Sequence, residues 1–319
     1  MNRRDCLKGM AGAVRLSLWP SAMVLAQQSE PPMIPGPDQA TKTPAFRVPA
    51  GTVDTHTHIF GPPEKYPYAA KRPYTPPAAP LEMFRALHAK LGVDRAVLVN
   101  ATVHGTDNRV VLDAIAQSNG RYLGIANIDE SISEDELDAL NRGGIRGCRF
   151  AFLSRLGGTP DLGRVERLAQ RVAKFGWHVD LYFEADQVES FLPVLARLPT
   201  PYVIDHMGSC RADLGIDHPS FTALVDLLHR DDKGWMKITG PERVSAKGPP
   251  FHDAVPFARK LIEAAPERVI WGTDWPHPNV KIMPNDGDLI DLIPLYAPDP
   301  VQQRKLLVDN PVRLFGFQS

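Results

Sequence analysis

Short apolar runs alternate with longer amphipathic segments along the chain from residue 51 onward. The runs are rich in β-branched and aromatic residues, which is typical of buried strands, and the segments between them have the spacing of helices that bury one face. Eight strands are predicted, at residues 51–60, 95–100, 122–128, 144–152, 178–184, 202–208, 234–240 and 269–276. The clearest helical patterns cover residues 80–92, 107–118, 161–176 and 255–268, and several of them stop at Gly or Pro.

Eight strands that each lead into a helix predict an α/β fold with a parallel sheet, and the number and length of the units match a (β/α)8 TIM barrel. An open doubly wound sheet is the second choice. The distinction matters for function, because the active sites of such barrels lie at the C-terminal ends of the strands.

Residues that bind ligands or transfer protons collect at these strand ends. Side chains at positions i and i+2 of a strand face the same way, so His56 and His58 in "VDTHTHIF" point to one spot. The late positions of the fourth, fifth, sixth and eighth strands carry Arg149, Tyr182, His206 and Asp274. Convergence from separate strands therefore predicts a site at one rim of the barrel.

This frame resembles the amidohydrolase superfamily, in which the first strand ends in His-x-His, the sixth in His and the eighth in Asp. "VDTHTHIFGP" and "GTDWPHPN" are similar to its 2-pyrone-4,6-dicarboxylate lactonase branch, and the likeness runs from residue 51 to the terminal "DNPVRLFGF". The resemblance implies a barrel of the metal-dependent-hydrolase type that lacks the metal, and a hydrolase that opens the lactone ring of a small anionic substrate such as 2-pyrone-4,6-dicarboxylate.

The resemblance also assigns roles. Asp274 is expected to be the general base, as the only carboxylate at a strand end inside the histidine cluster, and His56, His58 and His206 are expected to present N–H groups to the carbonyl oxygen. Arginine forks suit carboxylates, so arginines are expected to hold the substrate. The substrate-binding residues implied in this way are Arg149, Arg155, Arg243, Tyr182, Thr102 and Asn279.

A zinc enzyme is the main alternative. Metal-using members of the superfamily complete their site with a His from strand five or a Lys or Glu from strand four. Here strand five ends at Tyr182, its His178 lies near the opposite end, and strand four offers Arg149, whose permanent charge repels a divalent ion. No cofactor is therefore expected. If a metal were bound, as Zn²⁺ in a mononuclear hydrolase or decarboxylase, its ligands would be His56, His58, His206 and Asp274.

Two further functions stay open. Lactonases for sugar acids or sulfomuconolactones share the same motifs. A binding protein for aromatic-derived acids is disfavoured, because a carboxylate such as Asp274 hinders the binding of an anion.

Composition agrees with a small-molecule enzyme. The 319 residues include 36 basic and 37 acidic side chains and carry a formal charge of −1, which gives no field for attracting nucleic acid or a membrane surface. No apolar run is long enough to span a bilayer in the mature chain. The 3 cysteines form no disulfide framework, and Cys148 and Cys210 are expected to be buried free thiols.

The N-terminus resembles a twin-arginine export signal. Arg3 and Arg4 precede a short, mostly apolar segment, and "MVLAQQ" offers a cleavage site after Ala26. The predicted organisation is a signal peptide at 1–26, a Pro- and Gln-rich linker at 27–50 and the barrel at 51–319. The expected location is the periplasm, and otherwise the cytoplasm.

Overall fold

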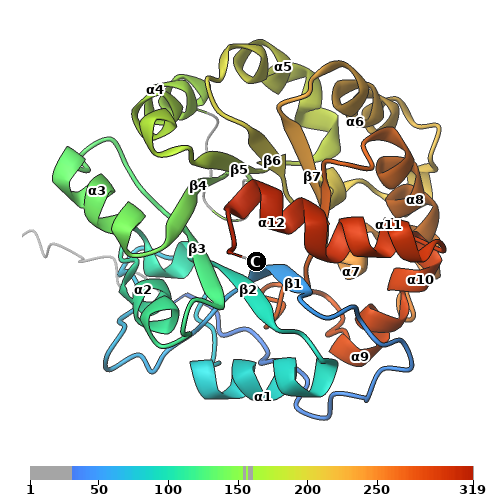
Figure 1. Cartoon of the computed structure of the whole chain (residues 1–319), viewed down its shortest axis with the longest axis horizontal. Helices are drawn as coiled ribbons and strands as arrows, with labels where there is room; N and C mark the ends of the chain where they lie inside the picture. Colours follow the sequence, from blue (N-terminus) through green and yellow to red (C-terminus); the bar gives the residue numbers. More distant parts are fainter. Residues whose placement is uncertain (1–30, 154–155, 157–160, 319) are drawn as a thin grey trace, which may run out of the picture. The chain divides into compact units, whose positions relative to one another are not determined.

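The computed structural model describes residues 31–153, 156 and 161–318. Each strand of its eight-stranded sheet pairs in parallel with the next along the chain, from β1 to β8 (Figure 1). The strands are Val53–Thr57, Arg95–Val99, Tyr122–Ala126, Ile145–Ala151, His178–Tyr182, Tyr202–Ile204, Gly234–Ile238 and Val269–Trp271. Every predicted run contains one of them. The predicted (β/α)8 barrel is thus confirmed, and the open doubly wound sheet is wrong.

Backbone contacts bring β1 against the segment that follows β8. The amide of Asp274 donates to the carbonyl of His56 over 2.8 Å, and the amide of His58 donates to the carbonyl of Trp275 over 2.7 Å. The close approach depends on Gly272, where an added Cβ would lie 2.6 Å from the amide nitrogen of His56. These contacts place the two ends of the sheet side by side.

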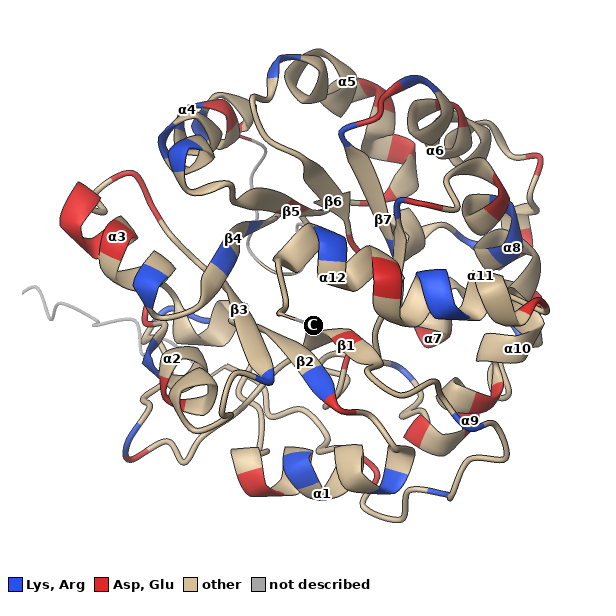
Figure 2. Cartoon of the chain, viewed as in Figure 1, with Lys and Arg blue, Asp and Glu red and all other residues tan. Residues whose placement is uncertain are grey.

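Helices surround the sheet, and Figure 2 shows acidic and basic residues distributed over them. Helix α1 buries Leu81, Phe84, Leu87 and Leu91, at the spacing of one helical face, and ends at Gly92, whose φ of 75° suits glycine. The helices of the described residues are α1 Leu81–Leu91, α2 Arg109–Ala116, α3 Glu134–Arg142, α4 Leu162–Val172, α5 Val188–Arg197, α6 Pro219–Arg230, α7 Pro241–Val244, α8 Val255–Ala264, α9 Asp286–Asp291, α10 Ile293–Tyr296, α11 Pro300–Arg304 and α12 Asn310–Phe315.

Helix α12 covers the N-terminal end of the barrel. Phe315 and Phe317 pack in one apolar cluster with Val53, Val97 and Val203 from the strands, and Figure 1 shows α12 lying across the centre of the sheet. With that end covered, the C-terminal ends of the strands form the accessible face.

Several strands are shorter than predicted at the C-terminal end. β1, β6 and β8 end at Thr57, Ile204 and Trp271, so His58, His206 and Asp274 lie just beyond a strand instead of within it. The backbone turns there: φ is 50° at His206 and 69° at Asp274, which is incompatible with a strand. The strands were predicted to be longer than they are because the rim loops that follow them are also buried and therefore apolar.

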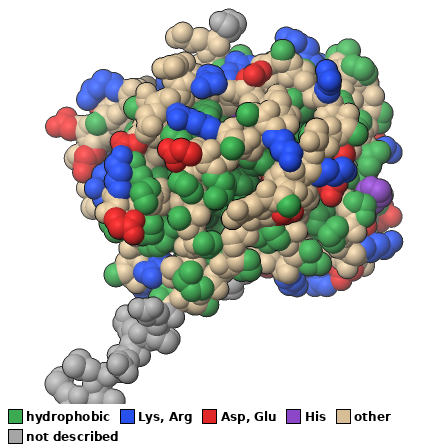
Figure 3. Space-filling view, turned by 90° about the horizontal axis from the view of Figure 1, so that it is seen from below, with side chains coloured by type: hydrophobic (Ala, Val, Ile, Leu, Met, Phe, Trp, Pro, Cys, Tyr) green, Lys and Arg blue, Asp and Glu red, His purple; other side chains and the backbone are tan. Residues whose placement is uncertain are grey.

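The first described residues, ahead of β1, pack against the barrel. Residues 31–50 contact the barrel, for instance through Lys42, whose backbone amide donates to Asn285 over 2.9 Å. On the face drawn in Figure 3, charged side chains of both signs are mixed among hydrophobic ones. Within the described part of the chain, no helix has the length and apolar character needed to cross a membrane.

Candidate active site

The three predicted histidines and Asp274 meet at the C-terminal rim, and all four are buried. Oδ1 of Asp274 lies 3.6 Å from Nε2 of His56 and 3.5 Å from Nε2 of His58. The rings of His56 and His206 are 4.6 Å apart between centroids. The tertiary structure therefore assembles the cluster that the strand ends predicted.

The two oxygens of Asp274 have different surroundings. Oδ2 accepts hydrogen bonds from Nε of Arg243 over 3.0 Å and from Nη2 over 2.6 Å. Oδ1 is buried and has no hydrogen-bond partner among the described residues. Burial alone would raise the pKa of Asp274, but Arg243 and the nearby histidines outweigh it and hold the pKa well below its ordinary value. The result is an ionised carboxylate with one oxygen anchored and the other available.

The other predicted site residues that the structure describes line a small cavity beside Asp274 and the histidines. Arg149 donates from Nε to Oδ2 of Asp205 over 2.8 Å and lies over the ring of Tyr182 at 5.0 Å. The Tyr182 ring in turn packs edge-on against His206 at 4.6 Å. The cavity is lined by residues that include Thr102, Asn279, Arg149, Tyr182, Arg243 and Tyr74. Of these, Tyr74 was not predicted, because it comes from the long β1–α1 loop, which carries no motif. Arg155 lies outside the described residues.

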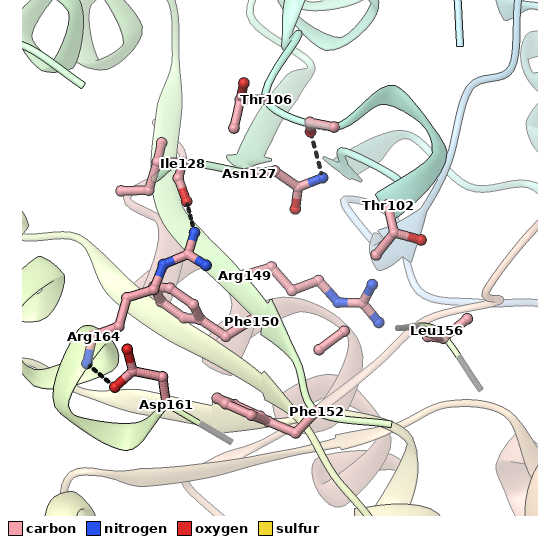
Figure 4. A pocket seen from close by; sticks show the side chains of 12 residues that line it. Thr102, Thr106, Asn127, Ile128, Arg149, Phe150, Phe152, Leu156, Asp161 and Arg164 are labelled. Atoms are coloured by element: carbon pink, nitrogen blue, oxygen red, sulfur yellow. Dashed lines mark hydrogen bonds between the residues drawn. The ribbon is translucent and has the colours of Figure 1, made fainter. Parts of the chain in front are cut away.

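A second, larger cavity adjoins the first. The small one, beside Asp274 and the histidines, has a volume of about 20 Å³, which is the scale of a single water. The larger one has about 420 Å³ and shares Thr102, Arg149 and Leu156 with it. Figure 4 shows the guanidinium of Arg149 directed between Thr102 and Leu156, with Arg164 across the cavity. Arg164, which donates to the carbonyl of Ile128 over 2.9 Å, was also missed from the sequence.

Beneath the rim lies a buried network of charges that sequence reasoning did not find. Lys237 contacts Oδ2 of Asp180, and its Nζ lies 3.1 Å from Oδ1 of Asp205 and 3.2 Å from Nδ1 of His56. Asp205 Oδ1 is itself 3.3 Å from His56 Nδ1, so the statement that Asp274 is the only carboxylate inside the histidine cluster is wrong. The available signal was a charged residue inside an apolar strand, as in "HVDLY" and "WMKIT".

The network changes the ionisation of its members. Burial would raise the pKa of Asp205, but Lys237 and Arg149 hold it well below the ordinary value. Burial lowers the pKa of His56 to about 4 in spite of the Asp205 carboxylate. At neutral pH, Asp205 is therefore an ionised carboxylate whose charge is balanced by Lys237 and Arg149, and His56 is an uncharged imidazole.

Three other histidines have structural partners. His104 lies 3.3 Å from the carbonyl of Ile59, and His277 lies 3.1 Å from Asp286; neither lines the small cavity. His178 sits at the start of β5, 3.2 Å from Asp180 and away from the rim, as expected. The expected burial of Cys148 and Cys210 as free thiols is confirmed.

The donor atoms alone would suit a metal ion. Ligand atoms of His56, His206 and Asp274 lie within 4.8 Å of one another. The charges around them do not suit it: Arg243 already binds the Asp274 carboxylate, and Lys237 and Arg149 are buried close by. A divalent ion would have to compete with three fixed cations.

Comparison with known proteins adds to this geometry. The sequence model of the amidohydrolase family matches residues 53–317. The chain belongs to the amidohydrolase family. A 2-pyrone-4,6-dicarboxylate hydrolase of Comamonas testosteroni is 44% identical over 281 residues, which is 85% of this chain and 92% of that protein. A 4-sulfomuconolactone hydrolase of Rhizobium radiobacter is 42% identical, with 92% of this chain and 99% of that protein covered.

Solved structures agree with this membership of the amidohydrolase family. A probable 2-pyrone-4,6-dicarboxylic acid hydrolase from Acinetobacter baumannii, with citric acid bound, superposes with a TM-score of 0.73 at 27% identity and covers 84% of this chain and 100% of that one. The resemblance drawn from the sequence is confirmed, and with it the expectation of a hydrolytic enzyme.

Proposed function

We propose that this amidohydrolase opens the lactone ring of a small anionic substrate, with 2-pyrone-4,6-dicarboxylate as the first candidate and 4-sulfomuconolactone as the second. The observation that carries the proposal is the asymmetry of Asp274, whose Oδ2 is fixed by Arg243 and whose Oδ1 faces the histidines beside a water-sized cavity. Relatives above 40% identity are named for hydrolysis of these two lactones.

The chemistry follows from the arrangement. Oδ1 of Asp274 takes a proton from water, and the water oxygen bonds to the lactone carbonyl carbon. The carbonyl oxygen becomes an oxyanion, which N–H groups of the histidine cluster stabilise. Collapse of this intermediate breaks the ring C–O bond, and the proton held by Asp274 passes to the departing oxygen. The low pKa of Asp274 keeps it ionised at neutral pH, which is the form that can accept a proton.

Recognition of the anion falls to the arginines. Arg149 uses Nε for Asp205, and the other end of its guanidinium is directed toward the larger cavity (Figure 4). A substrate that reacts at Asp274 and extends past Thr102 would place a distal carboxylate or sulfonate there. Arg243, although bound to Asp274, lines the small cavity as well.

A lactone panel tests the proposal. Hydrolysis rates should be compared for a dicarboxylate lactone, a sulfonated lactone and a neutral lactone of similar size. We expect turnover of at least one anionic lactone with kcat/KM at least tenfold above that of the neutral one, since a charge-assisted contact contributes about 1.5–3 kcal/mol. Preference for the neutral lactone would overturn the proposed substrate class.

We further propose that the reaction needs no metal, because Arg243 already neutralises Asp274. Prolonged treatment with a chelator, followed by metal analysis, should leave the rate unchanged, while a zinc-dependent hydrolase treated in parallel loses activity. Stoichiometric zinc that is lost together with the rate, and restores it when added back, would favour the zinc alternative with His56, His58, His206 and Asp274 as ligands.

We also propose export through the twin-arginine route, on sequence alone, since residues 1–30 lie outside the described part. Joint substitution Arg3→Lys and Arg4→Lys should move the protein from the periplasmic to the cytoplasmic fraction. Arg15→Lys, outside the pair, is the matched control. Finding the unchanged chain at full length in the cytoplasm would contradict the proposal.

A further inference from the structure

The proton on His56 has a defined position because of Lys237. Nζ of Lys237 lies 3.2 Å from Nδ1 of His56, and both side chains are fully buried. An ammonium group only donates hydrogen bonds, so Nδ1 must accept and cannot carry a proton of its own. The single proton of the neutral imidazole then resides on Nε2, the atom that faces Oδ1 of Asp274 at 3.6 Å.

Asp205 is the competing partner of Nδ1. Its Oδ1 lies 3.3 Å from Nδ1, but this oxygen also faces the Lys237 ammonium at 3.1 Å, which balances its charge. A proton on Nδ1 would also point at the ammonium of Lys237. Doubly protonated His56 is excluded by the same contact, because an Nδ1 that accepts from Lys237 carries no proton.

His58 has the opposite arrangement. Its Nδ1 lies 2.8 Å from the carbonyl oxygen of Val99, which only accepts, so Nδ1 carries the proton. A neutral His58 consequently turns the lone pair of Nε2 toward the cavity. The expectation that all three histidines present N–H groups therefore fits His56 but not a neutral His58.

We infer that Lys237 is a positioning residue that fixes the tautomer of His56, so that Nε2 of His56 presents its N–H toward Oδ1 of Asp274 at the edge of the small cavity, while His58, which lines that cavity, accepts a hydrogen bond there. Its catalytic meaning rests on the proposed function: His56 would donate to the lactone carbonyl oxygen, and His58 would accept from the attacking water. Lys237 is held in place by Asp180, which is in turn 3.2 Å from His178 at the start of β5. Two cations, Lys237 and Arg149, balance Asp180 and Asp205 in the barrel interior.

Nitrogen NMR of protein labelled with ¹⁵N-histidine tests the tautomers without any substrate. In the unmodified protein at pH 7, we expect a pyridine-type Nδ1 and pyrrole-type Nε2 for His56, and the reverse for His58. Signals are assigned by the loss of one set in His56→Gln and in His58→Gln. A pyrrole-type Nδ1 on His56 would overturn the inference, even if no variant of Lys237 folded.

A charge-balanced pair of variants tests the role of Lys237. The double variant Lys237→Met with Asp180→Asn removes one positive and one negative charge and leaves Asp205 Oδ1 as the nearest neighbour of His56 Nδ1. Because this oxygen accepts, the His56 proton should move to Nδ1, and the N–H in the cavity is lost. Asp180→Asn alone keeps Lys237 and should keep the original tautomer. An unchanged tautomer in a folded double variant would contradict the inference.

Kinetics connect the tautomer to catalysis. Loss of one oxyanion donor reduces kcat by about 10²–10³-fold, so the double variant should lose about that much in kcat with KM changed only a few-fold. A double variant with the inverted tautomer and full kcat would mean that His56 does not donate to the reacting oxygen. The expected tautomers in a protein that hydrolyses no lactone would overturn the proposed function and leave the role of Lys237 in place.

Discussion

At the scale of single residues, the site works through unequal partners for similar groups. Asp274 has one oxygen bound to Arg243 and one without a partner among the described residues, whereas Asp205 lies between Lys237 and Arg149. Both carboxylates are buried beside His56, yet of the two only Asp274 lines the small cavity, where its oxygen can take a proton from water. Position relative to the cations, and not residue type, separates the base from its neighbour.

Asp274→Asn should abolish turnover while leaving binding of a substrate analogue within about tenfold. The amide keeps the shape and an oxygen for Arg243 but cannot take up a proton, so kcat should fall by about 10²–10⁴-fold. Steady-state rates and calorimetric titration measure the two effects. Asp226→Asn on the outer face of α6 is the control, and a variant that keeps over a tenth of the original rate would assign the base to another group.

Arg149→Lys should weaken recognition of anionic lactones selectively. Lysine keeps the charge next to Asp205 but lacks the planar fork, so we expect a loss of about tenfold in kcat/KM for the anionic lactone and a much smaller loss for a neutral one. Arg146→Lys is the matched control, because Arg146 is on β4 too but bonds to the carbonyls of Asn141 and Ile145. Equal losses on both substrates would mean that Arg149 supports the cluster and not the substrate.

At the scale of elements, the catalytic groups stand on loops that leave the strands early. Strands β6 and β8 have three residues each, and the positive φ at His206 and Asp274 turns the chain inward over the barrel. Hydrogen bonds between β1 and the segment after β8 hold these loops in register, and Asp54 reinforces them by accepting from the amide and hydroxyl of Thr273. The hydrogen bonds that close the barrel between β1 and the segment after β8 therefore also position the catalytic residues.

Gly272→Ala should damage both stability and activity. The new Cβ would lie 2.6 Å from the amide of His56 and 2.9 Å from Oδ1 of Asp54, so β1 would have to shift at the catalytic histidine. Overpacking of this kind costs about 1–3 kcal/mol in the free energy of unfolding. Urea unfolding and kcat measure the two effects.

Gly163→Ala in α4 is the control for this substitution. There the nearest atom is the flexible end of Arg167, and alanine favours the helix, so stability should stay equal or rise. A Gly272→Ala variant that unfolds at the same urea concentration as the unmodified protein and retains its rate would show that β1 and the segment after β8 can move apart without loss of stability or activity.

At the scale of the whole molecule, the barrel interior is a charged layer closed off from water. α12 covers one end of the barrel, and the residues of the rim lie over this layer at the accessible end, so Lys237, Asp180 and Asp205 are fully buried. Such a layer is stable only while each charge keeps its partner. Stability of the fold should therefore depend on pH.

Acidification should destabilise the fold well above the pH at which ordinary carboxylates titrate. An unfolded histidine takes up a proton near pH 6.5, whereas folded His56 does so near pH 4. Between these values the unfolded state binds one more proton, so the free energy of unfolding rises with pH and is lost as pH falls from 6.5 to 4, by about 3 kcal/mol. The lowered pKa of His206 acts in the same direction in this range, and the lowered pKa values of Asp205 and Asp274 act in the same direction below about pH 4.

Urea unfolding at pH 7, 5.5 and 4.5 measures this dependence. His56→Gln should flatten the curve in this range, while His229→Gln, an exposed histidine of α6, should not. A folded protein whose stability is independent of pH between 6.5 and 4 would contradict the neutral, buried state of His56.

The sequence by itself determined the order of eight strands and helices, and with it the barrel and the rim where His56, His58, His206 and Asp274 meet. These features follow from local periodicity and from the rule that parallel strands bring their C-terminal ends to one edge. The family motifs then indicated the hydrolase. Strand ends were less well determined, because buried loops are as apolar as the strands that they extend.

Only the tertiary structure decided which groups pair. Lys237 and His56 are 181 positions apart, and Arg149 and Asp205 are 56 apart, so their contacts depend on strand register and barrel closure and not on any local pattern. The same contacts place Asp205 beside the histidines, assign Arg243 to Asp274 and orient the proton of His56. Charge and hydrogen-bond partners at buried sites are set by distances of a few ångströms between distant segments, which periodicity in a sequence does not encode.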